Sequence, residues 1–169
     1  MARLRRHFGR AFTLVEALLA SVILAMAITA ILMPFTAGAQ NEQADARSTL
    51  AVALAQELME EILSKPFRDP QGDTEPGPDG DERRGRSYFD NMDDYHGYAE
   101  EEWGILALDG TRVTDPAAAG LTRRVTATYV YVAGQDVSEA PTFLRITVDV
   151  RYSGQPLVSL TRLVYDTSQ

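Results

Sequence analysis

The sequence predicts an α+β fold in which a long N-terminal helix packs on a C-terminal antiparallel sheet. Three observations lead to this prediction. Residues 12–33 form an almost wholly apolar run, residues 50–63 place apolar side chains at helical spacing, and residues 142–152 alternate between apolar and polar side chains. A helical period followed by a strand period, without regular alternation of the two, is typical of α+β domains.

Composition excludes several classes of protein. The chain has 169 residues, enough for one domain or for one domain with an appendage. It contains no cysteine, so disulfides, thiolate metal sites and thiol nucleophiles are excluded. Its formal net charge of -8 argues against a general nucleic-acid binder, which needs a basic face.

The N-terminal segment combines a basic leader with an apolar helix. Residues 1–11 contain four arginines and no acid, and the almost wholly apolar stretch that follows is long enough to cross a bilayer, since 22 residues of helix span roughly 33 Å. We assign the membrane segment to residues 12–35. Arginines before the apolar run and none close behind it predict a cytoplasmic N-terminus, with everything after Phe35 across the membrane.

Glu16 does not fit a plain membrane anchor. An ionised carboxylate at the centre of a bilayer costs about 2.5–3.5 kcal/mol on the translocon-based scale. Glu16 either lies at the headgroup boundary or meets a positive partner inside an assembly. A cleaved signal peptide is a further alternative, with Ala37, Gly38 and Ala39 as its cleavage site, but the apolar run is longer than usual and the helical pattern continues past that site.

The segment around Glu16 resembles a known processing motif. Ala11, Phe12, Thr13, Leu14, Val15 and Glu16, followed by an apolar helix, resemble the motif of type IV prepilins and type II secretion pseudopilins. The resemblance covers residues 1 to about 35. Ala11 stands where the family usually has glycine, so processing is expected to be slower at most. Pro34 lies one position from where many pilins carry a helix-breaking proline.

The resemblance implies a processing route and a set of partners. A prepilin peptidase would cut between Ala11 and Phe12, remove the leader and N-methylate Phe12. Glu16 would then pair with the Phe12 amine of a neighbouring subunit, because a buried carboxylate is tolerated only when it is paired. The implied partners are the peptidase, other pilin or pseudopilin subunits and the assembly platform of the bacterial inner membrane.

The helix is expected to continue beyond the membrane through residues 36–65, with a bend or local melting at Pro34 and Gly38. One stripe of this helix is apolar, and its positions are Leu50, Ala51, Leu54, Ala55, Leu58, Ile62 and Leu63. Pro66 ends the helix because it cannot continue the hydrogen-bond ladder. We interpret the stripe as the seat of the C-terminal sheet; a coiled coil is the alternative.

Residues 66–102 form an acidic segment that is rich in proline and glycine, with 12 acids against 3 arginines from residue 69 onward. This composition predicts a solvated surface loop. Residues 88–98 differ, because they interleave four aromatic residues with acids, and such aromatics indicate that this part packs on the domain. The same stretch resembles one in minor pilin-like proteins of mannose-sensitive haemagglutinin-type pili and in related pilus-modification proteins, which favours a minor subunit.

No cofactor and no metal site are assigned from the sequence. Asp90, Asn91, Asp93 and Asp94 offer oxygen ligands of the kind that calcium prefers, but their spacing is not that of an EF-hand loop. His96 lies beside acids, yet no nucleophile or oxyanion motif accompanies it. We therefore predict that the protein is not an enzyme.

Residues 103–169 are expected to form the antiparallel sheet. The segment 103–113 predicts a short hairpin with its turn at Asp109 and Gly110. Strands are predicted over 121–133, 142–152 and 157–165, with the last turn at residues 153–156. In the middle strand Leu144, Ile146, Val148, Val150 and Tyr152 share one face. That face needs a cover, and the leucine stripe supplies it, as in the pilin fold that the resemblance implies.

These features lead to one functional expectation with a runner-up. We expect a minor pilin or pseudopilin that is anchored once in the inner membrane with a periplasmic head, and is then assembled into, or primes, a filament at the cell surface. The alternative is a singly anchored periplasmic binding or adhesion protein that does not polymerise. A secreted binding protein released by signal peptidase is the third possibility.

Overall fold

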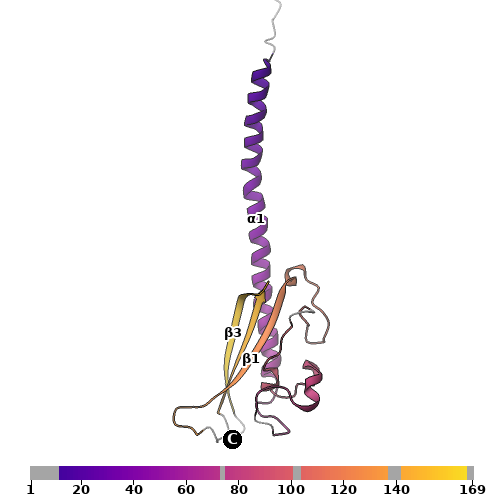
Figure 1. Ribbon diagram of the computed structural model, residues 1–169, viewed down its shortest axis with the longest axis vertical. Coiled ribbons are helices and arrows are strands. Elements are labelled where there is room, and N and C mark those ends of the chain that lie inside the picture. The colour runs from indigo at the N-terminus through magenta and orange to yellow at the C-terminus, as the bar shows by residue number, and fades with distance from the viewer. Residues whose placement is uncertain (1–11, 73–74, 101–103, 137–141, 167–169) are drawn as a thin grey trace, which may run out of the picture. The chain divides into compact units, whose positions relative to one another are not determined.

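The computed structural model describes residues 12–72, 75–100, 104–136 and 142–166 (Figure 1). Within them lie one α-helix, four short 3₁₀-helices and three strands. The chain divides into two compact units, Met1–Gln43 and Ala44–Gln169, and the helix α1 (Leu14–Leu63) contributes to both. The α+β layout expected from the sequence is confirmed: one long N-terminal helix, and a three-stranded antiparallel sheet on which its last turns pack.

In the first unit, α1 carries the apolar run. Every described side chain from residue 12 to residue 43 is exposed, and the helix is long and apolar enough to cross a membrane. The helix is unbroken at Pro34 and Gly38, so the local melting expected there is wrong. Proline removes one backbone hydrogen bond, whereas the surrounding alanine-rich turns favour helix. The helix ends at Leu63, shortly before Pro66, as expected.

In the second unit, which we call the head, the last four turns of α1 provide one side of the core. The buried side chains recur at helical spacing and are Ala51, Leu54, Ala55, Leu58, Met59 and Ile62. The predicted stripe is thus confirmed at its centre, although Leu50 is only half-buried and Leu63 is 38% exposed. Met59 belongs to the core and was missed because it lies beside the four-residue repeat.

The sheet provides the other side of the core. β1 (Leu121–Val130), β2 (Phe143–Tyr152) and β3 (Gln155–Tyr165) pair antiparallel in the order β1-β2-β3. In β2, Leu144, Ile146, Val148 and Val150 are fully buried and Tyr152 packs against them, which confirms the predicted face. Figure 1 shows the end of α1 lying against this sheet. The segment that links α1 to β1 lies to one side of the two.

Three details of the expected strands are corrected. β1 ends at Val130 rather than at Ala133, and β3 begins at Gln155, so the turn is confined to Ser153 and Gly154. The expected hairpin over 103–113 is present but shorter than expected, with an antiparallel bridge between Leu106 and Arg112, and Trp103 lies outside the described residues. The Ala107 amide donates to the Thr111 carbonyl at 2.8 Å and the Val113 amide donates to the Ile105 carbonyl at 2.9 Å, so the hairpin and its turn are confirmed.

The acidic segment is more ordered than a solvated loop. It contains η1 (Gly80–Arg84), η2 (Arg86–Tyr88) and η3 (Asp93–Tyr95). Phe89 and Tyr95 are buried, with ring centroids 4.9 Å apart and the rings at 75°. The expectation that the aromatic part of this segment packs on the domain is therefore confirmed.

Candidate functional site

The N-terminal end of α1 carries the residues of the predicted processing motif. Phe12, Thr13, Leu14, Val15 and Glu16 are all exposed, and Ala11 lies outside the described residues. The Glu16 amide donates to Thr13 Oγ1 at 3.2 Å, and the Thr13 amide donates to Glu16 Oε2 at 3.4 Å. This is the reciprocal arrangement of a capping box. Glu16 thus helps to begin its own helix, a role that the Thr-x-x-Glu pattern could have indicated.

A buried arginine lies at the centre of the head. Arg123 is fully buried in β1 and donates to both carboxylate oxygens of Glu100, at 2.6 Å and 2.8 Å. It also donates to the backbone carbonyls of Leu54 in α1 and Leu106, at 3.1 Å and 2.5 Å. One side chain therefore joins the helix, the sheet and the connecting segment.

A second arginine extends this network. Arg86 forms a salt bridge with Glu61 of α1 and also contacts Glu100 at 3.3 Å. Burial opposes ionisation of Glu61, but the hydrogen bonds from Arg86 and Tyr95 outweigh it and lower the pKa of the Glu61 carboxyl. Burial, with the neighbouring Glu100, raises the pKa of Tyr98 to about 12. The network is charge-paired and holds η2 against the helix.

The four residues considered as calcium ligands do not converge on one point. Asn91 Oδ1 accepts from the backbone amides of Asp93 and Asp94, at 2.9 Å and 3.0 Å, so Asn91 shapes the turn. Burial raises the pKa of Asp93 to about 6, and Asp93 interacts with Tyr129. Of the four, Asp90 and Asp94 share a cluster of carboxylate oxygens.

Glu82 of η1, which sequence analysis did not select, joins Asp90 and Asp94. One carboxylate oxygen from each residue lies within 4.8 Å of the other two. Burial, and then the negative charges of Asp94 and Asp90, raise the pKa of Glu82 to about 7. Nothing in the sequence pattern distinguishes Glu82 from the other acids of the segment, because folding alone brings it opposite residues 90 and 94.

His96 contacts the first strand of the sheet. Its ring is exposed, and Nδ1 accepts a hydrogen bond from the Ala127 amide at 3.3 Å. This bond ties the end of η3 to β1. The amide of Gly97, the residue after His96, donates to the Val125 carbonyl at 3.1 Å, which strengthens the same attachment.

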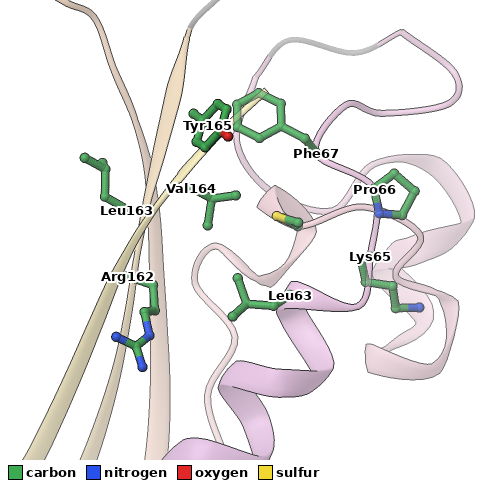
Figure 2. A pocket seen from close by; sticks show the side chains of 9 residues that line it. Leu63, Lys65, Pro66, Phe67, Arg162, Leu163, Val164 and Tyr165 are labelled. Carbon is green, nitrogen blue, oxygen red and sulfur yellow. The ribbon is translucent and has the colours of Figure 1, made fainter. Parts of the chain in front are cut away.

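A hollow of about 470 Å³ lies between the end of α1 and β3 (Figure 2). Leu63, Pro66 and Phe67 lie on one side, and Val164 and Tyr165 lie on the other. The lining is mainly apolar, and the described residues bring no pair of acid and base together in it. The hollow therefore offers an apolar surface against which other side chains could pack.

Three polar features of the described residues are the capping box at the N-terminal end of α1 and, in the head, the paired network around Arg123 and the acidic cluster around Glu82. The capping box involves residues of the predicted processing motif, the network stabilises the fold, and the cluster is without a positive partner in the described part of the chain. Comparison of the chain with protein-family models, with curated proteins and with solved structures gives no match.

Proposed function

We propose that this chain is a minor pilin or pseudopilin subunit, cut between Ala11 and Phe12 and assembled through α1 into a type IV pilus or type II secretion-type filament. The proposal rests on the motif from Ala11 to Glu16 and on the apolar helix that follows it. Its partners are a prepilin peptidase, other subunits and an inner-membrane assembly platform. The chain crosses the inner membrane once, with its N-terminus in the cytoplasm and its head in the periplasm, before assembly.

The single observation that carries the proposal is the acid within an uncovered apolar helix. Glu16 lies among side chains such as Leu14, Val15 and Leu18, which are 59–80% exposed in the single chain. Within the part of the chain that the structure describes, its hydrogen bonds are short-range ones with Thr13. Apolar surface of this extent is typical of a membrane or assembly face. A carboxylate on such a face is stable when a cation meets it, and the Phe12 amine of a neighbouring subunit is that cation.

The state of the mature N-terminus tests the proposal. Protein purified from its own membranes is expected to begin at Phe12 and to carry one methyl group on the Phe12 amine, as intact-mass measurement and N-terminal sequencing would show. A chain that begins at Met1 or Ala2 would instead support the singly anchored protein that does not polymerise. A chain that begins at Gln40 would support a secreted protein.

Glu16→Ala is expected to leave cleavage largely intact and to reduce incorporation into filaments strongly, because the Phe12 amine of the next subunit loses its partner. The measurement is the fraction of subunit in sheared filaments, relative to the membrane fraction. Glu42→Ala, an exposed acid of the same helix, is the matched control and should incorporate normally. Equal incorporation of the two variants would contradict the assembly role of Glu16.

A further inference from the structure

Three carboxylates of the acidic segment converge inside the head. Glu82 comes from η1, Asp90 follows η2 and Asp94 belongs to η3, and one oxygen of each lies within 4.8 Å of the others. Glu82 and Asp94 are 4% and 1% exposed, so bulk water does not separate their charges. One carboxylate oxygen of Glu82 also lies within 4.8 Å of one carboxylate oxygen each of Asp69 and Asp79.

Each of the three carboxylates is held in place by one of its oxygens. Glu82 Oε2 accepts from the Asp79 amide at 3.0 Å, and Asp90 Oδ2 accepts from Gln71 Nε2 at 3.0 Å. Asp94 Oδ2 accepts from the amides of Asp90 and Asn91, at 2.8 Å and 3.0 Å. The carboxylates are therefore oriented by the fold and are not free to swing apart.

Two of the remaining carboxylate oxygens lack donors. Glu82 Oε1 and Asp90 Oδ1 are buried and have no hydrogen-bond partner among the described residues. The nearby arginines are engaged elsewhere, since Arg84 pairs with Asp81 and Arg86 pairs with Glu61. A buried carboxylate oxygen without a donor is costly, so such groups in proteins are paired or coordinate a metal ion.

We propose that Glu82, Asp90 and Asp94 bind one calcium ion, which joins η1, the end of η2 and η3 and fixes the acidic segment on the head. Calcium takes six to eight oxygen ligands at about 2.3–2.6 Å in flexible geometry, so two of its ligands lie up to about 5 Å apart. Carboxylates from three separate short elements suit that flexibility better than the strict octahedron of magnesium. The proposal does not depend on assembly of the chain into a filament.

The test is calorimetric titration of the full chain in detergent, after removal of divalent ions with a chelator, using calcium chloride. One ion is expected to bind per chain and to raise the melting temperature. Glu82→Gln and Asp90→Asn, which keep side-chain shape and remove one charge each, are each expected to weaken binding at least tenfold. Asp81→Asn is the matched control, because this neighbour in η1 is 81% exposed, and it should bind calcium within twofold of the original chain.

The competing explanation is a proton shared between Glu82 and Asp94. It predicts no calcium uptake at millimolar concentration. It also predicts that the melting temperature of the Glu82→Gln variant equals or exceeds that of the original chain, whether or not calcium is present. That result would overturn the proposal. Equal binding by Glu82→Gln, Asp90→Asn and the original chain would also overturn it, and tighter binding of magnesium chloride would overturn the choice of calcium. If Glu82→Gln fails to fold in chelator, Asp90→Asn decides the outcome.

Discussion

Replacing Arg123 with alanine is expected to destabilise the head by about 3–5 kcal/mol, the usual cost of removing one partner of a buried ion pair. The Arg123 side chain is fully buried, and its loss leaves the Glu100 carboxylate, which is 6% exposed as a residue, without its bidentate donor. The carbonyl of Leu54 loses a donor as well. Urea unfolding followed by near-ultraviolet circular dichroism measures the change.

Two further variants separate the ion pair from general damage to the sheet. Arg145→Ala removes an exposed arginine of β2 and should change the free energy of unfolding by less than about 0.5 kcal/mol. Arg123→Met combined with Glu100→Gln leaves no uncompensated charge from this pair, so it should recover part of the lost stability. A loss below about 1 kcal/mol in Arg123→Ala would show that the pair does not stabilise the head.

Replacing Leu54 with aspartate is expected to unfold the head. Leu54 is 3% exposed on the face of α1 that packs under the sheet. Removing a buried leucine side chain alone costs about 2–5 kcal/mol, and an unpaired charge in the same place adds to that cost. The sum approaches the total stability of a small domain, about 5–15 kcal/mol. Loss of the near-ultraviolet circular dichroism signal and of the cooperative melting transition is the expected result.

Val52→Asp is the matched control for that experiment, because residue 52 lies on the same helix two positions away and is 43% exposed. It introduces the same charge into the same helix and should leave the melting temperature nearly unchanged. An unchanged transition in Leu54→Asp would refute the packing of this helix face against the sheet.

The sequence predicted the elements that rely on short-range periodicity. The stripe centred on Leu54 and Leu58 and the alternation in β2 both arise from the fixed repeat of a helix and of a strand, so neighbouring residues are sufficient to reveal them. Arg123 shares the inward-facing parity of Leu121 and Val125, and this alternation could have indicated its burial. Its partner Glu100 could not be identified in the same way, because that pairing joins separate elements.

The candidate site was only partly predictable for the same reason. Asp90 and Asp94 were considered as oxygen ligands, but Asn91 turned out to cap a turn and Asp93 to face Tyr129. Glu82 lies close to Asp90 and Asp94 because long-range contacts hold the acidic segment in place. One example is Lys65, whose Nζ donates to the Phe89 carbonyl at 2.5 Å across 24 residues.

By itself, then, the sequence determined the order of the elements and the apolar face of each, and it predicts the processing motif with Glu16, because these depend on residues close together in the chain. Only the tertiary structure decided the ordered path of the acidic segment, the pairing of Arg123 with Glu100 and the meeting of Glu82 with Asp90 and Asp94. The physical reason is that a loop has no repeat of its own. Its conformation is selected by long-range hydrogen bonds, ion pairs and buried aromatic rings that form only when the helix and the sheet are in place.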